Sequence, residues 1–360
     1  MNKCYPATAL AFALSQANVA MAVNPFLEEV IVTSSRVPMP LRQIGTSVSV
    51  ITQQDIQQRG FNSLQDILRS QPSIGVTNAG GAGKATSLRI RGEESYRTLV
   101  LLDDIDISDT STPQVTPRLE YLLSAGIQRV EILRGPQGLM YGADAGGVVN
   151  ITTVRQTDGI AGQVSAEGGR YGSQQFAGNL GWGNETVDVN VSAADFQTDG
   201  FNARTTDRDL KDDDGYDNTT LHGRFGWNVN EDLRLSLVAR NVDGDTDYDG
   251  CFNPDTFASS NRCKDEFEQD IWRVAGDYKW GRFNHQVFYS NSETNRDSYS
   301  DGQFSGRFDG EIERYGYQGS FQGSDALRLV YGLDLETESA DGTFLTGDRD
   351  QDGYYMEYQG

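Results

Sequence analysis

Aspartate residues occupy alternate positions in three polar stretches of the sequence. These residues are Asp212 and Asp214 before Gly215; Asp243, Asp245, Asp247 and Asp249; and Asp348, Asp350 and Asp352 before Gly353. Carboxylate oxygens at this spacing, with a glycine for the bend, suit Ca²⁺, which takes hard oxygen ligands. The bidentate glutamate of a full calcium loop is missing, because Gln359 holds the twelfth position counted from Asp348. The stretches equally fit solvated acidic loops, so both interpretations stay open.

Few residues suit catalysis. His222 and His285 are the only histidines, each lies in a strand-like segment, and no G-x-S-x-G nucleophile turn is present. The glycine-rich stretch before Lys84 partly resembles a phosphate loop, but Ala85 stands where that loop needs Ser or Thr. The sequence therefore predicts no enzyme active site and no catalytic cofactor.

The N-terminal segment has the features of a secretory signal. Lys3 precedes an apolar stretch around 7–14, and Ala20-Met21-Ala22 has the small-residue pattern of a cleavage site. We therefore expect a signal peptide over 1–22, which removes Cys4. In an exported protein the close pair that remains, Cys251 and Cys263, predicts a disulfide.

Composition narrows the class of protein. Among 360 residues, 52 Asp and Glu outnumber 30 Lys and Arg, for a net charge of -22. This field repels phosphate backbones, so we expect no nucleic-acid partner. Beyond the signal no apolar run reaches the roughly 18 residues of a membrane-spanning helix. A membrane location would therefore require strands that close into a barrel.

The first half of the chain has a mixed pattern of short helices and strands. Thr52 is placed to cap a helix that Gly60 ends, and Ser63 starts a second helix that Pro72 prevents from continuing. Three apolar runs indicate buried strands. These are Val48 to Ile51, Thr98 to Leu102 and Arg129 to Leu133. The pattern predicts a small α+β domain between about Val23 and Val154.

The second half alternates between apolar and polar residues, as in Val187, Val189 and Val191 against Asp188 and Asn190. About nine or ten such segments follow residue 156, which is typical of antiparallel transmembrane β-barrel strands. Short turns are expected near Asn184, Asn230, Gly281 and Gly323, and long loops over 197–217, 243–269, 293–309 and 337–352. A soluble β-sandwich shares the alternation but needs neither this rhythm nor aromatic residues near strand ends. Those aromatic residues are Trp182, Trp227, Trp272 and Trp280.

The long loops carry much of the acidity. Residues 197–217 hold seven carboxylates against three basic side chains, and residues 243–269 hold eight against two. The negative charge therefore belongs to an outer surface.

Several sequence segments resemble TonB-dependent outer-membrane receptors. EEVIVT at Glu28 to Thr33 is an extended, β-prone segment at the place of that family's TonB box. SLRIRG at 87–92, LVLLDD at 99–104 and VEILRGPQGLMYGADAGGVVNITT at 130–153 resemble segments of the family's plug domain, in the same order. Asp103-Asp104 departs from the family's usual Asp-Gly, which puts one turn in doubt.

The resemblance implies an architecture and a set of partners. A signal (1–22) would be followed by the TonB box and linker (23–40), the plug (41–155) and the first part of the barrel (156–360), in the cell outer membrane. TonB and its inner-membrane energising complex would bind Glu28, Glu29, Val30, Ile31, Val32 and Thr33. Family barrels have 22 strands, so we expect the chain to stop within its barrel and not to transport alone.

The resemblance also indicates a ligand, a small-molecule metal chelate held by two apical loops of the plug. The ligand-binding candidates are Asn78, Gly80, Lys84, Ser108, Thr110, Thr112 and Gln114. Cobalamin receptors order their outer loops with calcium, and that similarity makes Asp212, Asp214 and Asp249 calcium candidates. Cobalamin is the favoured ligand. A ferric-siderophore receptor and a non-transporting surface docking or adhesion protein are the alternatives.

Overall fold

The computed structural model describes residues 31–32, 39–40, 45, 47–135, 146–204, 212–324, 327–343 and 345–359. The predicted signal peptide, 1–22, lies outside these residues, and so does most of the predicted linker. No helix within the described ranges is long and apolar enough to cross a membrane.

Two short helices open the first domain where the sequence predicts them. Helix α1 (Gln53–Arg59) begins with a capping box, in which Thr52 accepts from the backbone N–H of Asp55 while the Asp55 carboxylate accepts from Thr52. It ends at Gly60, whose φ of 62° lies in the left-handed region. Helix α2 (Leu64–Arg69) follows Ser63 and buries Leu64, Ile67 and Leu68.

A five-stranded sheet forms the centre of this domain. Its order is β3 (Ser47–Thr52), β10 (Ile127–Arg134), β11 (Gly147–Thr153), β6 (Thr98–Leu102) and β7 (Ile105–Asp106). The pairing of β11 with β6 is parallel and the other pairings are antiparallel. All five residues of β6 are buried, which is the reason for its unbroken apolar run. The three predicted strands are therefore confirmed.

Three smaller pairings complete the described part of the first 155 residues. Strand β1 (Ile31–Val32) pairs with β2 (Met39–Pro40), β4 (Ile74–Asn78) with β5 (Thr86–Ile90), and β8 (Ser108–Asp109) with β9 (Thr116–Pro117). The predicted ligand-binding residues lie in the turn of the β4–β5 hairpin and in the loop between β8 and β9, except Asn78, which ends β4, and Ser108, which begins β8.

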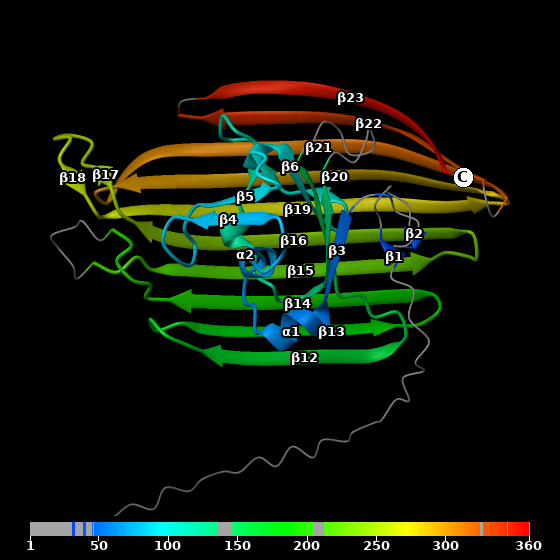
Figure 1. The fold of residues 1–360 in the computed structure, drawn as a ribbon, viewed down its shortest axis with the longest axis horizontal. Coiled ribbons are helices and arrows are strands. Elements are labelled where there is room, and N and C mark those ends of the chain that lie inside the picture. The colour runs from blue at the N-terminus through cyan, green and yellow to red at the C-terminus, as the bar shows by residue number, and fades with distance from the viewer. Residues whose placement is uncertain are drawn as a thin grey trace, which may run out of the picture.

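Ten antiparallel strands in sequential order form the second part of the chain. They are β12 (Gly159–Gly168), β13 (Gln174–Gly183), β14 (Val187–Thr198), β15 (Tyr216–Asn228), β16 (Leu233–Tyr248), β19 (Cys263–Trp280), β20 (Phe283–Ser300), β21 (Gln303–Ser324), β22 (Leu327–Gly342) and β23 (Thr346–Gln359). A small hairpin, β17 (Cys251–Phe252) and β18 (Ser259–Ser260), projects from one end of this sheet (Figure 1). The strand number agrees with the nine or ten predicted.

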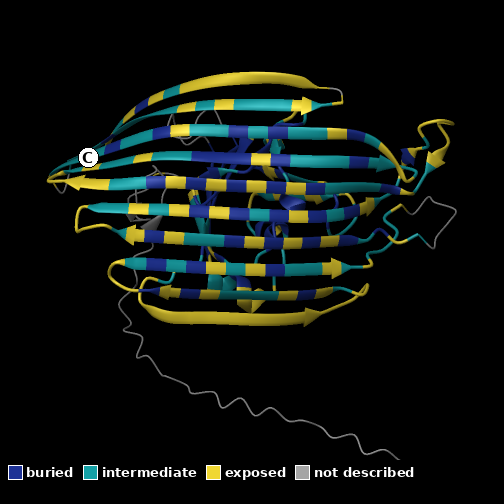
Figure 2. Cartoon of the chain, turned by 180° about the vertical axis from the view of Figure 1, so that it is seen from behind, coloured by how far each residue is buried: buried dark blue, intermediate teal, exposed yellow. Residues whose placement is uncertain are grey.

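The sheet is polar on the face toward the first domain and apolar on the opposite face. On β14, Asp188 and Asn190 are buried, whereas Val191 is 55% exposed. Figure 2 shows this alternation of buried and exposed residues along the central strands. The four predicted tryptophans, Trp182, Trp227, Trp272 and Trp280, are all exposed. An apolar outer face with aromatic side chains is the pattern of a sheet that faces lipid.

Two of the four predicted long loops are wrong. Residues 293–309 belong to β20 and β21, which are joined by a tight turn at Asp301 and Gly302, and most of 337–352 belongs to β22 and β23. These strands extend beyond the part of the sheet whose outer face is apolar. In the extensions neither face needs apolar residues, so the sequence there resembles a loop. The loop predicted over 243–269 is shorter than expected, because β16 continues to Tyr248 and β19 begins at Cys263.

The first domain packs against the inner face of the ten-stranded sheet (Figure 1). Its apolar core contains Leu68, Leu102 and Ile132, and Val238 and Ile271 of the sheet join the same cluster. The large strands thus form a wall, and the smaller domain lies against it.

Candidate functional site

Asp103 fixes the small domain to the wall near the middle of the strands. Its carboxylate accepts from Arg224 Nη1 at 2.6 Å, from the Thr153 backbone N–H at 3.0 Å and from Thr153 Oγ1 at 2.6 Å. His222 Nε2 lies 3.3 Å from the same carboxylate. Burial raises the pKa of Asp103, but the hydrogen bond with His222 and the charge of Arg224 outweigh it and hold the pKa below its ordinary value.

The turn that carries Asp103 has an unusual backbone. Asp103 and Asp104, the two residues between β6 and β7, have φ values of 49° and 66°. A two-residue hairpin with both residues in the left-handed region favours Asn or Gly. Asp103 and Asp104 therefore form the turn although the second residue is not glycine, and Asp103 serves as the anchor.

The first predicted ligand loop, between β4 and β5, is organised by Asn78. Its side-chain amide donates to the carbonyls of Gly81 and Lys84, and its Oδ1 accepts from the N–H groups of Gly80 and Gly81. Asn78 thus closes the loop on itself, and Gly80 is half-buried within it.

Lys84 points from this loop into the wall. It is 4% exposed, and its Nζ lies 3.2 Å from the carbonyl oxygens of Asp214 and Gly215 and 3.0 Å from Thr246 Oγ1. Burial lowers the pKa of this amine, and the nearby carboxylates of Asp214, Asp247 and Asp249 oppose the shift. A direct contact between Lys84 and a ligand would require the amine to leave these oxygens.

The second predicted ligand loop is also partly held by the wall. Ser108 and Thr110 are buried, and Thr110 Oγ1 donates to the carbonyl oxygen of Ser339 at 2.6 Å. Thr112 is half-buried with its hydroxyl on the carbonyl of Gln114, whose own side chain is exposed. Gln114 is therefore the predicted residue of this loop that is most accessible to a ligand, and the ligand role of all seven candidates stays a prediction.

One of the three calcium candidates, Asp214, is engaged by other groups of the protein, and the calcium role of all three stays a prediction. Asp214 Oδ2 accepts the backbone N–H of Ala203 at 2.8 Å, and the ammonium of Lys84 lies beside the same carboxylate. Within the described residues, no three or more His, Cys, Asp or Glu side chains are placed to hold a metal ion. The third aspartate stretch, 348–352, lies in strand β23, so Asp348, Asp350 and Asp352 point to the same face of the sheet.

The predicted disulfide between Cys251 and Cys263 is present. It closes the loop that carries the β17–β18 hairpin, and Asp301 of the next turn accepts from Asn253 and Ser260 of that loop. The link therefore stiffens an outer loop next to Asp249, the third calcium candidate.

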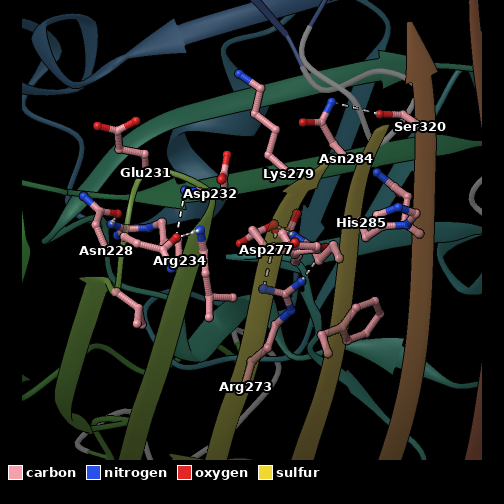
Figure 3. A pocket seen from close by; sticks show the side chains of 18 of the residues that line it. Asn228, Glu231, Asp232, Arg234, Arg273, Asp277, Lys279, Asn284, His285 and Ser320 are labelled. Carbon is pink, nitrogen blue, oxygen red and sulfur yellow. Dashed lines mark hydrogen bonds and ion pairs between the residues drawn. The ribbon is translucent and has the colours of Figure 1, made fainter. Parts of the chain in front are cut away.

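A cavity of about 980 Å³ opens at the end of the wall that carries the short turns. Figure 3 shows its charged lining, which includes Arg234, Arg273, Asp277 and Lys279. Arg273 donates to Gln286 at 3.1 Å, and its guanidinium lies over the ring of Phe288 at 4.6 Å. The cavity lies away from the predicted ligand loops, so it is not the site that the sequence predicts.

A second cavity, of about 410 Å³, lies at the opposite end, where the two domains meet. Asn78, Gly81 and Gly83 of the first ligand loop line it, together with Glu120 and Tyr216. Burial raises the pKa of Glu120 to about 7, against the opposing charge of Arg118. This cavity includes one predicted residue, Asn78, and is the better candidate for ligand contact.

Of the predicted TonB-binding residues, Ile31 and Val32 form β1, and Glu28, Glu29, Val30 and Thr33 lie outside the described residues. The backbone register pairs Ile31 with Pro40 and Val32 with Met39. In Figure 1 this pair lies toward the end of the sheet that carries the short turns.

Comparison with known proteins identifies the family. The profile of the TonB-dependent Receptor Plug Domain matches residues 40–149. This range includes the whole five-stranded sheet except the part of β11 beyond residue 149. Over 99% of its length the chain is 27% identical to a protein named vitamin B12 transporter BtuB from Photobacterium profundum. The chain is a TonB-dependent receptor. The small domain is its plug, the ten-stranded wall is part of its barrel, and the family is one of receptors rather than enzymes.

Other relatives agree on the fold. A vitamin B12 transporter BtuB from Vibrio vulnificus is 26% identical over 87% of the chain. The chain spans 58% of the Photobacterium protein and 50% of the Vibrio protein. Among solved structures, the siderophore receptor PirA from Acinetobacter baumannii has a TM-score of 0.66 at 18% identity, covering 83% of this chain and 48% of PirA. The ferric enterobactin receptor PfeA from Pseudomonas aeruginosa has a TM-score of 0.67 at 18% identity, covering 87% and 51%.

Barrels of this family are proteins of the outer membrane, and the receptor is located there, as the sequence predicts. Sequence reasoning missed the anchor formed by Asp103, Thr153, His222 and Arg224. The departure from Asp-Gly is at Asp104 and gave no signal for this anchor, because the anchor is Asp103, whose partner Arg224 is 121 residues away in the sequence.

Proposed function

We propose that the receptor imports a scarce metal chelate across the outer membrane, using energy that TonB delivers from the inner membrane. The observation that carries this proposal is the plug, which fills the inner side of the barrel wall and is fixed there through Asp103. Equilibrium binding cannot concentrate a ligand, so a plugged barrel that imports needs work from outside. TonB would supply it by pairing with the β-prone segment at 28–33.

Cobalamin is the favoured ligand, and two observations support it. The curated relatives over most of the chain carry the name vitamin B12 transporter, and the first predicted ligand loop lines the outer cavity. A ferric siderophore is the runner-up, because the solved structures with the same fold include siderophore receptors.

Competition for binding distinguishes the two ligands. Cells that lack other receptors and express this one should bind radiolabelled cyanocobalamin at the surface, and excess unlabelled cyanocobalamin should displace it. Displacement by ferric enterobactin, with no saturable cyanocobalamin binding, would establish the siderophore alternative. Binding of either chelate without uptake in energised cells would support a docking protein instead.

Calcium stays a separate prediction for Asp212, Asp214 and Asp249. If calcium orders the outer loops, EDTA should weaken cyanocobalamin binding, and added Ca²⁺ should restore it. No step of the proposed import depends on calcium.

A further inference from the structure

Four oxygen atoms surround the ammonium group of Lys84 at the junction of plug and wall. Besides the carbonyls of Asp214 and Gly215 and the hydroxyl of Thr246, the carbonyl of Ala82 lies 3.4 Å from Nζ. An ammonium has three donors and no acceptor, so oxygen atoms on several sides satisfy it well. Three of the four oxygens are backbone carbonyls, an arrangement that suits a cation in general.

Glycines let the plug loop approach the wall closely enough for this contact. A methyl group on Gly80 would overlap Ala203, and one on Gly83 would overlap the ring of Tyr216. A methyl group on Gly81 would lie 3.0 Å from the ring of Phe201. All three glycines have positive φ, which side chains disfavour, so both the backbone and the space at this loop require glycine.

The wall side of the junction is the loop between β14 and β15, which contains two of the three calcium candidates. The charges of Asp214, Asp247 and Asp249 act on Lys84, while Asp214 Oδ2 is already engaged by Ala203. A positive charge belonging to the plug therefore stands where the sequence suggests a metal ion.

We propose that the ammonium of Lys84 is the built-in cation of this junction and locks the plug loop 78–86 to residues 212–216 of the wall, at the start of β15. The charged hydrogen bonds hold the two segments together. The close approach that the glycines allow leaves no space between the segments for one to move without the other. A ligand that shifts the outer loop would then shift the plug loop with it. The lock is a property of the folded chain and holds whichever ligand the receptor binds.

Hydrogen exchange of backbone amides tests the lock in receptor purified from outer membranes in detergent. Lys84→Met keeps the apolar stem but removes the charge, and Gly83→Ala inserts a methyl group against Tyr216. Each variant should speed exchange about tenfold or more in both the plug segment 78–86 and the wall segment 212–216, because charged hydrogen bonds contribute on that scale. Faster exchange in only one segment, or in neither, overturns the proposal.

Two control variants match these changes. Gly92→Ala adds a methyl group at a glycine that also has positive φ, 85°, but has no atom within 4 Å of the new group. Lys264→Met removes a lysine that pairs with Asp245 and Glu266 on the wall. Neither control should change exchange in the two segments, and a change with Lys264→Met equal to that with Lys84→Met would trace the effect to net charge.

Treatment with a chelator distinguishes a junction held by Lys84 from one held by a metal ion. EDTA should leave exchange of the wild-type receptor unchanged in both segments, and acceleration by EDTA would show that a metal, not Lys84, holds the junction. If Lys84→Met does not accumulate in the membrane, Thr246→Val removes one acceptor alone. That variant should raise exchange a few fold in both segments, and unchanged exchange would overturn the lock.

Discussion

The carboxylate of Asp103 in the plug lies 2.6 Å from Nη1 of Arg224 in strand β15. Asp103 is nearly fully buried, and the Arg224 side chain is 21% exposed. Together with Thr153 and His222, this pair connects a turn of the plug to the middle of the barrel wall. Its strength therefore contributes to how firmly the plug is held.

Asp103→Asn should destabilise the plug by about 3 kcal/mol, because it leaves Arg224 without its buried counter-charge. Native-state hydrogen exchange of β6 and β11 amides, in detergent, measures the change. Asp104→Asn is the matched control. The Asp104 side chain is 62% exposed, and its carboxylate comes no closer than 4.0 Å to the guanidinium of Arg273. Equal effects of the two variants would show that the anchor contributes no more than a surface aspartate.

The same anchor predicts a response to acid. The pKa of Asp103 in the folded plug lies below its ordinary value, so its stabilisation is present above that ordinary value, about 3.9, and is lost as the pH falls through the folded pKa. Denaturant unfolding of the plug along a series of acidic pH values should therefore show a smaller loss in Asp103→Asn than in wild type. Parallel pH profiles would exclude this linkage.

Glu120 should make the plug less stable as the pH rises. Burial raises its pKa to about 7 from an ordinary 4.5, so the folded plug holds the proton more tightly than the unfolded chain. Stability should then fall between these two pH values, and Glu120→Gln should recover about 3 kcal/mol above them. Glu94→Gln, at a side chain 53% exposed, is the control. A Glu120→Gln variant with an unchanged pH profile of unfolding would contradict the prediction.

Asp104→Gly should stabilise the plug modestly, by up to about 1 kcal/mol, because Asp104 has a φ of 66° that glycine adopts without strain. Asp104→Ala also removes the carboxylate but keeps the β-carbon, so it isolates the backbone effect. Denaturant unfolding of the plug should rank the glycine variant above the alanine variant. The reverse order would rule out strain at this turn.

Replacing both Cys251 and Cys263 by serine should loosen the outer loop but not the plug. A loop of this length, with the cysteines 12 residues apart, contributes roughly 3 kcal/mol in the chain-entropy estimate. Limited proteolysis should cut the loop around 253–258 faster in the double variant, and reduced wild type should behave in the same way. The loop packs on Asp301 of the wall, so faster exchange or unfolding of the plug in the double variant would contradict the prediction.

Local patterns in the sequence predicted the parts of the fold whose faces differ in polarity. The run from Thr98 to Leu102 was readable because both faces of β6 are buried, and Val187 to Val191 because one face meets lipid and the other the plug. The stretch 293–309 was not readable, because even its buried side chains, such as Thr294 and Ser298, are polar, and polar residues suit either a loop or a strand. Regular alternation at 348–352 has the same ambiguity.

The candidate site was harder to predict because its contacts join distant segments. Lys84 meets Asp214, and Asp103 meets Arg224, across more than a hundred residues. Residue spacing within a loop indicates which groups could bind a cation or ligand. It does not indicate that a lysine of another domain lies among them.

Energy-dependent uptake in cells carrying Ile31→Pro tests the central proposal most directly. Proline removes one backbone donor from the segment proposed to pair with TonB, whereas the control Ile31→Ala keeps that donor. Radiolabelled cyanocobalamin should still bind the surface of Ile31→Pro cells but should not enter them, as in wild-type cells whose proton gradient has been collapsed. Normal uptake by Ile31→Pro, or uptake that persists without the gradient, would contradict the proposal.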